Sequence, residues 1–518
     1  METTELANLV FKNVFGIEKP YSEQLQYFVE VWEQASNGMA PVTVLKLPTG
    51  YGKTEALISP YFGQIVANSW AVAPRVIYSL PTQALCNQLY SRILKYAKNA
   101  ESKFKHKIVV EVQHGGKSED PYFVGDIVVT TFDQLLYGYA RALKHIHNRV
   151  DIPAGSISFS HVVLDEAHMY SAYTHALVKA LLEIFCKSGI PISLATATMP
   201  TTLLNDMMQG LSNAVIVSFQ KGHIIKRNIR THVVDRNLLV DGRLNEYSRK
   251  LIEKAKNVLI VCNTVMRAIQ VWQDLRDSGY SETTLVHSRF TLEDRNAHEN
   301  KVVDFMGKNQ SSEKGIVVST QVCEAGLDIS ADLLITECAP ADALVQRTGR
   351  CARWENTEGD VYIFKSESHL PYDEEIIHLT WSYLQENPNL DFSDWAQTMK
   401  FVDKLSYTAD EIAARDSLDE LYDATLYAES RPSMLSAREN AFISLSLNEQ
   451  ITPQSLINVP YEIVDDDEFK RKVLVVKRGS FLNWDFGQRK WVERRYIAPY
   501  NIYLGNSENY DHEKGLHW

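Results

Sequence analysis

The chain has 518 residues, a length that suits two to four domains of ordinary size. Hydrophobic residues make up 45% and charged residues 23%, which is typical of folded globular proteins and excludes a disordered, collagen-like or disulfide-scaffold chain. The formal net charge of −12, from 53 Lys and Arg against 65 Asp and Glu, excludes a basic histone-like binder but not a local basic groove.

The cysteines and the first residues indicate the compartment. The six cysteines contain no C-x-x-C pair and no cluster, which argues against a metal site or a disulfide framework and fits a reducing cytosol. Glu2 and Glu5 stand where a signal peptide has positive charges. Lys179 and Glu183 interrupt the apolar stretch at 176–185 before it reaches the length of a membrane span. We therefore expect a cytoplasmic protein that does not contact a membrane.

From about residue 41 to 230, short β-rich apolar runs alternate with longer helical patterns, which indicates βαβ units and a parallel sheet. The predicted strands of this first part are Val42–Leu47, Arg75–Leu80, Ile108–Val112, Ile127–Thr130, Val162–Leu164 and Ile192–Ala195. A mixed basic and apolar stretch, Lys221–Arg236, is interpreted as a linker, and the alternation then starts again. The second set of predicted strands is Val258–Cys262, Thr284–Val286, Gly315–Ser319, Leu333–Glu337 and Asp360–Phe364.

The last third of the chain has a different pattern. Tyr372–Leu426 is acidic and helical in pattern, with Pro388 as a breaker, and alternating apolar segments past Ile451, such as Lys472–Lys477 and Trp491–Ile497, suggest strands. The predicted fold is α/β: two tandem parallel-sheet domains, followed by an accessory domain that is first helical and then β-containing. The predicted domains are residues 1–225, 226–372 and 373–518.

A phosphate-binding loop follows the first predicted strand. Val42–Leu47 runs into Pro48-Thr49-Gly50-Tyr51-Gly52-Lys53-Thr54-Glu55, whose glycines allow successive backbone N–H groups to point at phosphate oxygens. The helix that starts near Lys53 adds the positive end of its dipole. Lys53 is then placed to contact the β- and γ-phosphates, and Thr54 to bind Mg²⁺ through its hydroxyl. Leu47 stands where the longer form of the motif has its first glycine, so only the shorter T-G-x-G-K-T form is present.

Two carboxylates follow a later strand. The run His161–Leu164 leads to Asp165-Glu166-Ala167-His168. At the carboxyl end of a parallel strand, Asp165 can hold Mg²⁺ through water and Glu166 can polarise the attacking water. Two solvated acids at a strand end are the alternative, and the phosphate loop upstream argues against it. Thr196 and Thr198 end another predicted strand, and their hydroxyls can bond to Asp165 or His168 and report the nucleotide state, although such residues are usually caps or turns.

An arginine-rich segment follows the second set of strands. Gln346-Arg347-Thr348-Gly349-Arg350-Cys351-Ala352-Arg353 places three arginines at a spacing of three, which predicts one helical stripe. Such a stripe is usually a solvated face, but here it would supply an arginine finger to the γ-phosphate when the two sheets close. Gly326 and Asp328, which follow the predicted strand Gly315–Ser319, are candidates for contacts with ribose or Mg²⁺.

These segments together resemble the superfamily 2 DEAH-type helicases, which have two RecA-like domains. The segments that carry the resemblance are Gln24, Thr49–Thr54, Asp165–His168, Thr196–Thr198, Thr320–Asp328 and Gln346–Arg353. In that family the upstream glutamine, here Gln24, contacts adenine, and Arg350 and Arg353 match the finger arginines. The resemblance implies that Lys53, Glu166 and Gln346 are catalytic together with these arginines, and that ATP and Mg²⁺ are the cofactors.

Four further segments narrow the resemblance to the CRISPR-associated type I helicases: Val258–Val265 with Arg267-Ala268, His287–Phe290, His114–Lys117 and Val128–Leu136. This resemblance implies ATP-driven translocation on single-stranded DNA in the 3′-to-5′ direction, after recruitment by an RNA-guided surveillance complex. Many family members carry a metal-dependent HD nuclease domain in front of the helicase. Here no histidine precedes His106 and no His-Asp dipeptide occurs, so we expect the standalone form, with the nuclease on a separate subunit.

We expect ATP to lie between the two sheets, with Lys53 and Thr54 on one side and Arg350 and Arg353 on the other, so that hydrolysis opens the cleft. Nucleic acid would cross the opposite face of both domains, where hydroxyl and backbone N–H groups meet phosphates without reading bases. The candidate contacts are Thr82, Gln83, Thr130, Thr131, Asn263, Thr264, Ser288, Arg289 and Thr320. A tandem pair needs no second subunit, which predicts a monomer.

Two questions stay open from the residues alone. Lys470–Arg495, basic with interleaved aromatic residues, either binds single strands or forms the core of a small β domain with a wet cationic face. The ATPase segments equally fit an RNA helicase or remodeller, and a nucleotide-gated scaffold without turnover is a third class. The presence of both Glu166 and Arg350 argues against the scaffold.

Overall fold

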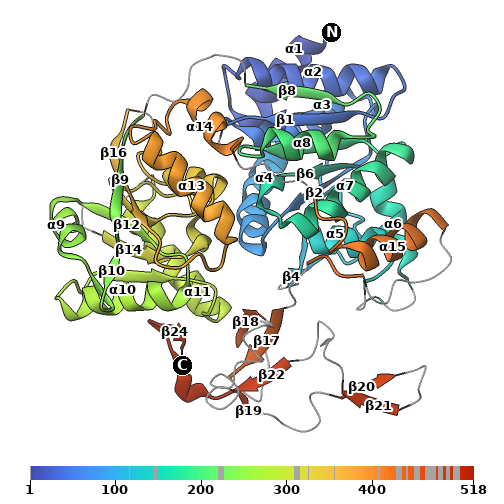
Figure 1. Cartoon of the computed structure of the whole chain (residues 1–518). Helices are drawn as coiled ribbons and strands as arrows, with labels where there is room; N and C mark the ends of the chain where they lie inside the picture. Colours follow the sequence, from blue (N-terminus) through green and yellow to red (C-terminus); the bar gives the residue numbers. More distant parts are fainter. Residues whose placement is uncertain are drawn as a thin grey trace. The chain divides into compact units, whose positions relative to one another are not determined.

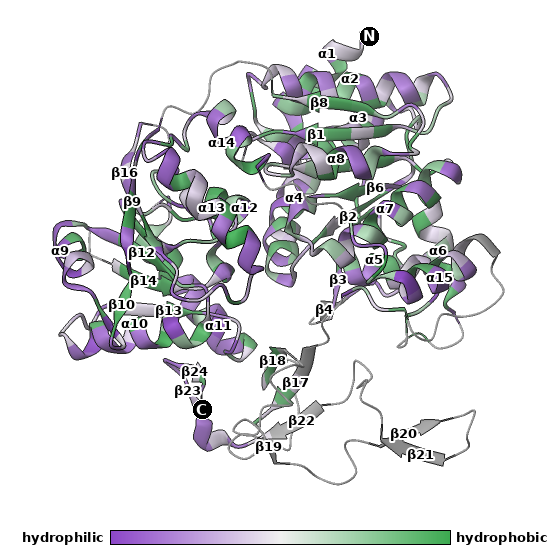
Figure 2. Ribbon diagram, in the orientation of Figure 1, coloured by the Kyte–Doolittle hydropathy of each residue, from purple (hydrophilic) through white to green (hydrophobic). Residues whose placement is uncertain are grey.

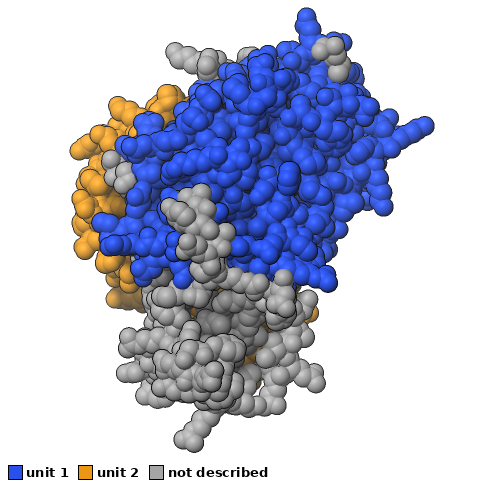
Figure 3. All heavy atoms as spheres, turned by 90° about the vertical axis from the view of Figure 1, so that its right-hand side faces the viewer, with its two compact units in different colours: residues 1–222, 406–439 blue, residues 223–405, 440–518 orange. Residues whose placement is uncertain are grey.

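The computed structural model forms two compact units, one of residues 1–222 and 406–439 and the other of residues 223–405 and 440–518 (Figure 3). They are called unit 1 and unit 2 below. The structure describes residues 2–48, 50–115, 117–143, 146, 149–219, 227–308, 315–324, 326–354, 356–404, 409–427, 435–438, 442–447, 455–460, 474–475, 482–485, 490–493 and 502–517. The domain boundaries at 225 and 372 stay a prediction.

Unit 1 is built on an eight-stranded sheet with the order β4-β3-β5-β2-β6-β7-β1-β8 (Figure 1). All pairings are parallel except that of β4 with β3. The strands are β1 (Val42–Lys46), β2 (Arg75–Leu80), β3 (Val110–His114), β4 (Lys117–Ser118), β5 (Ile127–Thr131), β6 (Ser160–Leu164), β7 (Ile192–Thr196) and β8 (Val215–Ser218).

Helices cover both faces of this sheet, which is why its central strands are continuous apolar runs. Alternate strand residues, such as Val162 and Val163 of β6, enter two different hydrophobic clusters. Figure 2 shows these strands in the hydrophobic colour. The helices are α1 (Thr3–Val10), η1 (Phe11–Phe15), α2 (Ser22–Ser36), α3 (Lys53–Ala67), α4 (Gln83–Phe104), α5 (Phe132–Tyr139), α6 (Asp151–Ser158), η3 (Ala167–Met169), α7 (Ala172–Lys187) and α8 (Thr201–Met208).

A later part of the chain also belongs to unit 1. This returning segment, defined as the described residues 409–427 and 435–438, contains α15 (Arg415–Tyr422) and η5 (Asp423–Tyr427). The Tyr173 hydroxyl of α7 donates to Ser417 Oγ at 2.7 Å, and Arg438 forms an ion pair with Asp133 of α5 at 3.1 Å. Leu421, like its neighbours in α15 and η5, is buried in the hydrophobic cluster that α7 and α8 share.

Unit 2 contains a six-stranded parallel sheet with the order β13-β14-β12-β15-β16-β9. Its strands are β9 (Asn228–Asn237), β12 (Asn257–Val261), β13 (Thr283–Val286), β14 (Gly315–Ser319), β15 (Leu333–Glu337) and β16 (Glu358–Lys365), with a small hairpin of β10 (Leu239–Val240) and β11 (Arg243–Leu244). Its helices are α9 (Glu246–Lys254), α10 (Val265–Asp277), α11 (Leu292–Met306), η4 (Gln321–Glu324), α12 (Ala341–Thr348), α13 (Glu374–Glu386) and α14 (Trp395–Val402).

The sequence interpretation of Lys221–Arg236 as a linker is wrong for most of its length. Residues 228–236 belong to β9, which pairs in parallel with β16 at the edge of the sheet. Only one face and one edge of such a strand are covered, so its apolar residues are too few to stand out in the sequence. Residues 221–226 lie outside the described part of the chain.

The C-terminal region contains short strands, as the sequence predicted. Four form one sheet with the order β18-β17-β22-β19, and two further pairs form hairpins. These strands are β17 (Phe442–Ser446), β18 (Leu456–Pro460), β19 (Leu474–Val475), β20 (Leu482–Asp485), β21 (Lys490–Glu493), β22 (Ile502–Gly505), β23 (Tyr510–Asp511) and β24 (Gly515–Leu516), with the short helix η8 (Ser507–Asn509). The side chains of 470–495 lie outside the described residues. The predicted fold class, two parallel-sheet α/β domains with a helical and β-containing C-terminal region, is confirmed.

Candidate active site

The candidate active site of unit 1 lies at the carboxyl ends of three neighbouring strands. In the sheet, β7 lies between β1 and β6, and Lys46 at the end of β1 is paired with Thr196 at the end of β7. The Leu47 amide continues this ladder by donating to the Thr196 carbonyl at 3.3 Å. Because parallel strands end at one edge, the phosphate loop, Asp165 and Thr196 are brought together there.

The phosphate loop has the backbone geometry that an anion requires. Gly50 and Gly52 have φ of +86° and +70°, in the left-handed region that favours glycine. Gly52 is the N-cap of α3 and provides no side-chain cap, which suits a helix start that binds an anion. A Cβ on Gly52 would lie 2.3 Å from Gln24 Nε2. These residues therefore fit a bound phosphate, whereas Thr49 lies outside the described residues.

Gln24 is bound to the phosphate loop itself. Its Nε2 donates to the Gly52 carbonyl at 2.9 Å, and its Oε1 accepts from the Tyr21 amide at 2.9 Å. The ring of Tyr21 stacks on that of Tyr51, with 4.1 Å between centroids. The buried Gln24 thus connects the start of α2 to the loop, a contact that the sequence analysis did not predict. Its role toward adenine stays a prediction.

Lys53 and Glu166 approach each other without a short contact. Lys53 Nζ lies 3.9 Å from Glu166 Oε1 and 3.4 Å from the Leu47 carbonyl oxygen. The lysine side chain is 7% exposed and that of Glu166 is 22% exposed, so both charges are partly removed from water. Glu166 has φ of +55°, which turns the chain sharply after Asp165. A positive and a negative group therefore face the same small region beside the loop.

Asp165 is held by hydrogen bonds on both carboxylate oxygens. Tyr78 of β2 donates its hydroxyl to Oδ2 at 2.6 Å, and the Glu166 amide donates to Oδ1 at 2.8 Å. Burial raises the pKa of Asp165, and the charge of Glu166 adds to this effect while Lys53 opposes it. Thr54 is a hydrogen-bond neighbour of Tyr78, so the hydroxyls of Thr54 and Tyr78 and the Asp165 carboxylate form one oxygen-rich group. Oxygen donors of this kind fit Mg²⁺.

His168 is connected to the end of β7. Its Nδ1 lies 3.1 Å from Thr196 Oγ1, which in turn accepts from the Met199 amide at 3.1 Å. The sequence allowed a bond from the Thr196 hydroxyl to either Asp165 or His168, and in the structure the hydroxyl contacts His168. Burial lowers the pKa of His168 to about 4, so the ring is neutral at pH 7, although Glu166 Oε2 lies 3.6 Å from Nδ1. Thr198, two residues further on, is buried. A coupling role for these residues stays a prediction.

Two residues of unit 1 support this site but were missed by the sequence analysis. One is Tyr78, already described. The other is His175 of α7, whose Nε2 lies 2.9 Å from the Ala167 carbonyl and ties the helix to the segment after Glu166. A tyrosine within a predicted buried strand was the only signal for Tyr78, and it became meaningful only once β2 was known to neighbour β6.

In unit 2, the three arginines do not form a helical stripe, so that prediction is wrong. Helix α12 ends at Thr348, and only Arg347 lies within it. Arg347 is fully buried and donates to Glu324 Oε1 at 2.8 Å, to Thr336 Oγ1 at 2.9 Å and to the Tyr372 hydroxyl at 2.9 Å. Arg347 therefore connects α12 to η4, to β15 and to Tyr372 in the interior of unit 2.

Arg350 and Arg353 differ in how strongly their present partners hold their guanidinium groups. Arg350 is 6% exposed and donates to the carbonyls of Cys323 at 3.0 Å, Glu324 at 2.5 Å and Leu327 at 2.8 Å. Arg353 is instead paired with the carboxylate of Asp328 at 2.8 Å, and that aspartate side chain is 56% exposed. Arg350 thus closes the loop after β14, whereas Arg353 has a partner that water can replace.

The remaining predicted nucleotide contacts of unit 2 surround these arginines. Gly326 has φ of +86° and lies in the loop that Arg350 holds. Asp328 pairs with Arg353, and Gln346 is a buried residue of α12. Unit 1 thus brings together Gln24, the loop and Asp165–His168, while unit 2 brings together Gly326, Asp328, Arg350 and Arg353.

Four of the nine predicted nucleic-acid residues lie at the starts of helices that follow strands. Thr82 caps α4 by accepting from the Leu85 amide at 3.3 Å, and Thr264 caps α10 by accepting from the Arg267 amide at 3.4 Å. Thr131 is the N-cap residue of α5. Such positions present helix N-terminal amides, which suit phosphates. Gln83 is the first residue of α4, Thr130 donates to the Gln113 carbonyl at 2.8 Å, and Thr320 is buried after β14.

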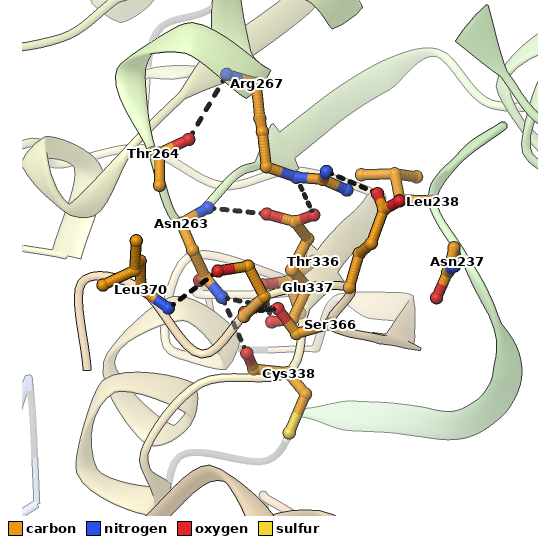
Figure 4. A network of polar contacts seen from close by, with 12 residues as sticks. Asn237, Leu238, Asn263, Thr264, Arg267, Thr336, Glu337, Cys338, Ser366 and Leu370 are labelled. Atoms are coloured by element: carbon orange, nitrogen blue, oxygen red, sulfur yellow. Dashed lines mark hydrogen bonds and ion pairs between the residues drawn. The ribbon is translucent and has the colours of Figure 1, made fainter. Parts of the chain in front are cut away.

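Asn263 lies inside a polar network rather than on a surface (Figure 4). Its backbone N–H donates to Glu337 Oε2 at 2.8 Å, and its side-chain Nδ2 donates to the Cys338 carbonyl at 2.8 Å. Arg267 reaches the other oxygen of the fully buried Glu337 at 2.6 Å. This network fixes the start of α10, so a contact of Asn263 with nucleic acid would have to be indirect, through Thr264.

The loop after β13 contains the last two predicted contacts. Ser288 is exposed, while Arg289 is 9% exposed and its Nη1 lies 3.8 Å from Met266 Sδ. Burial lowers the pKa of Arg289 to about 10, which leaves it charged at pH 7. Among the described helices, none is long and apolar enough to cross a membrane.

Comparisons with known proteins agree with this arrangement. Residues 28–206 match the family model of the DEAD/DEAH box helicases, and residues 254–356 match that of the C-terminal part of the CRISPR-associated nuclease/helicase Cas3. The CRISPR-associated helicase Cas3 of Thermoproteus tenax is 30% identical over 379 residues, which cover 70% of this chain and 63% of that protein. The chain thus spans less than two thirds of that relative.

Solved structures share the fold. The crystal structure of T. fusca Cas3 with ADP matches with a TM-score of 0.69 and 18% identity, over 96% of this chain and 68% of that one. A chain of a CRISPR RNA-guided surveillance complex in a pre-nicking state matches with a TM-score of 0.60 and 18% identity, over 94% of this chain and 70% of that one. At this identity the likeness concerns the fold alone.

Proposed function

Because the chain belongs to the Cas3 family of superfamily 2 DEAD/DEAH helicases, we propose that it is an ATP hydrolase that moves along single-stranded DNA. The observation that carries this proposal is the convergence of Lys53, Glu166 and His168 beside an uncapped glycine-rich helix start. A phosphate-binding loop alone would fit many nucleotide proteins. A carboxylate facing it, connected to the end of the neighbouring strand, fits one that breaks the phosphate bond.

In this proposal, each residue of unit 1 has a defined task. The amides at the start of α3 and Lys53 hold the phosphates, and Gln24 faces adenine beside the stacked Tyr21 and Tyr51. Thr54 and Asp165 would hold Mg²⁺, which would supply positive charge to the phosphate oxygens. Glu166 orients the attacking water and accepts its proton. The neutral His168 transmits a change at Glu166 to Thr196.

Unit 2 would complete the reaction with its arginines. Gln346, Arg350 and Arg353 are the proposed groups, and Arg353 is the one that can change its partner. Exchange of the exposed Asp328 carboxylate for a phosphate requires only the loss of a solvent-accessible ion pair, which is worth up to about 1 kcal/mol. Arg350 would reach a phosphate only by giving up hydrogen bonds to the carbonyls that hold the loop containing Gly326.

The substrate and partners follow from the relatives. We propose translocation in the 3′-to-5′ direction on single-stranded DNA, recruitment to an RNA-guided surveillance complex, and cleavage by a separate HD nuclease. The match to a chain of such a complex supports recruitment. The hydroxyl-rich helix starts at Thr82 and Thr264 fit backbone contacts that do not read bases.

The experiment compares ATP hydrolysis by the purified chain with single-stranded DNA, RNA of the same sequence and length, or neither. We expect stimulation by DNA, and no DNA degradation with Mg²⁺, Mn²⁺ or Co²⁺ present. Stimulation by RNA alone would contradict the DNA assignment and favour an RNA remodeller. Degradation of DNA by this chain alone would contradict the separate nuclease. Turnover that is absent under every condition would leave only the nucleotide-gated scaffold.

A further inference from the structure

The predicted nucleic-acid loop of unit 2 is in contact with the C-terminal end of the described chain. This loop, His287–Thr291, joins β13 to α11 and is called the 288 loop below. The C-terminal hairpin, Tyr510–Leu516, consists of β23 and β24 and lies against it, next to α10 and α11 (Figure 1). More than 200 residues separate the loop and the hairpin, so the sequence does not predict their contact.

Two hydrogen bonds join the backbones of hairpin and loop through Arg289 and His287. The Leu516 amide donates to the Arg289 carbonyl at 2.8 Å. His287 accepts from the Arg289 amide on Nδ1 at 3.1 Å, which places its ring proton on Nε2, from where it donates to the Lys514 carbonyl at 2.9 Å. Burial lowers the pKa of His287 to about 3, so this neutral form persists at pH 7. The histidine is thus a bridge between the loop backbone and the hairpin backbone.

The far side of the loop is held by Tyr510. Its hydroxyl accepts from the Thr291 amide at 3.0 Å and donates to the carboxylate of Asp294, in the first turn of α11. His512 also reaches Asp294, with its Nδ1 3.0 Å from the carboxylate. The hairpin therefore contacts the loop at both of its ends, before and after the exposed Ser288.

Close approach of hairpin and loop requires a glycine at position 515. Gly515 has φ of +70°, and a Cβ there would lie 2.6 Å from the Arg289 carbonyl oxygen and 2.7 Å from His287 Cε1. Any side chain would therefore push the loop and the hairpin apart. On the outer side, Glu513 pairs with Arg276 at 3.3 Å and Lys514 Nζ lies 5.9 Å from the centre of the Trp272 ring, which anchors the hairpin to α10.

We propose that the C-terminal hairpin positions the 288 loop for nucleic-acid phosphates, and that Tyr510, Gly515 and His287 are its positioning residues. This inference rests on the proposed function. The hairpin contacts fix the backbone of Arg289 and Thr291 and leave Ser288, between the two anchors, facing solvent. A loop fixed in this way loses little conformational entropy when it binds a phosphate. The C-terminus thus contributes to binding of the strand without having to touch it.

The test compares two glycine substitutions in the full-length chain. Gly515→Ala introduces a Cβ against the loop, whereas Gly242→Ala introduces the same strain at φ of +75° with no atom within 4 Å. Binding of a fluorescent single-stranded DNA is measured by anisotropy at several salt concentrations. For Gly515→Ala, we expect binding to weaken by about tenfold, the loss of roughly one charged hydrogen bond. The salt slope should fall by about one phosphate contact. Gly242→Ala should bind as the wild type does.

A second variant and a second measurement separate positioning from folding. Tyr510→Phe keeps the ring and removes the hydroxyl, and it should weaken binding in the same direction by a smaller factor. For both variants, we expect faster amide exchange at residues 289–291, an unfolding midpoint lowered no more than that of Gly242→Ala, and unchanged ATP hydrolysis without DNA. The proposal would be overturned if Gly515→Ala bound DNA with the affinity of the wild type despite faster amide exchange. It would also be overturned if amide exchange at residues 289–291 stayed at the wild-type rate. Failure of the wild type to bind DNA would overturn the proposed function itself, a result seen without any variant.

Discussion

In unit 1, Lys53 Nζ and Glu166 Oε1 are 3.9 Å apart, whereas in unit 2 Arg350 donates to three carbonyls within 3.0 Å. Both regions were predicted to face the same triphosphate. The hydrogen bond from Lys53 to the Leu47 carbonyl is long, at 3.4 Å, so the amine can take up a ligand at little cost. A guanidinium with its donors used by backbone oxygens would lose several bonds. A charged side chain at a predicted site is therefore not enough to predict ligand binding. The partners that the side chain already has decide whether it can bind a ligand.

Arg353 is intermediate between these two cases. It has a full ion pair at 2.8 Å, but its partner Asp328 is exposed to water. Screening by solvent makes such a pair weak, so it can be exchanged. Lys53 is therefore ready for a ligand, Arg353 can be released for one, and Arg350 supports the loop after β14. Variants of Glu166, Arg350 and Arg353 test this order.

The largest effect is expected at Glu166. Glu166→Gln keeps the shape of the side chain and removes the charge that faces Lys53, so ATP hydrolysis should fall by about 10²- to 10³-fold while nucleotide binding persists. Phosphate release and binding of a fluorescent ATP analogue measure the two quantities. Lys53→Ala should lose binding as well. Full hydrolysis by Glu166→Gln would remove this residue from the site.

Arg350→Ala and Arg353→Ala should separate stability from activity. Removal of Arg350 leaves three carbonyls without their donor and should lower the free energy of unfolding by about 2–4 kcal/mol. Arg353→Ala should cost about 1 kcal/mol, because it loses an ion pair with an exposed carboxylate and a long hydrogen bond to the Gly349 carbonyl, yet it should lower DNA-stimulated hydrolysis. Urea unfolding and ATPase assays measure both. Equal stability loss in the two variants would contradict the distinction.

The buried His161 tests the interior behind the site. It bonds to Ser193 through Nε2, and burial lowers its pKa to about 4. The neutral ring therefore stabilises the folded state fully above about pH 6.5, and this contribution is lost as the pH falls toward 4. Between pH 7 and 5 it should amount to about 2 kcal/mol. In His161→Gln, the fall of unfolding free energy over this range should be smaller by that amount; an unchanged fall would contradict the assignment.

The smallest effect is expected at Tyr78. Tyr78→Phe removes the hydroxyl that holds Asp165 Oδ2, so the gain in ADP affinity on addition of Mg²⁺ should shrink by about fivefold. Titration of fluorescent ADP with Mg²⁺ or with EDTA measures this gain. Tyr61→Phe is the control, because the buried Tyr61 hydroxyl has no hydrogen-bond partner among the described residues. An equal change in both variants would show a general packing effect.

Much of the fold could be predicted because its central strands are buried on both faces. Runs such as Val162–Leu164 are apolar without interruption, and polar residues then mark the strand ends. The order Lys53, Glu166 and Thr196 could be placed at one edge for the same reason. The edge strand β9 could not, because the sequence of Asn228–Asn237 is mainly polar and its pairing with β16 joins residues 130 apart.

The partners of the functional side chains were beyond the sequence. The sequence places Arg350 beside Gly349, which directly follows the last residue of α12 and was an available signal that the helix ends. Nothing local shows that three carbonyls after β14 would use its donors. The same holds for Tyr78 and Gln24, whose contacts arise from neighbouring strands and helices far apart in the chain.

The returning segment has a practical consequence for dissecting the molecule. The chain passes between the two units three times, at residues 222–223, 405–406 and 439–440. A fragment that stops at residue 222 would lose Leu421, Ala424 and Ala437 from its interior and expose the apolar side of α7 to water. Cutting at one position therefore cannot yield a well-folded half. A faithful N-terminal fragment would have to be fused to residues 406–439, and only then would its isolated behaviour be informative.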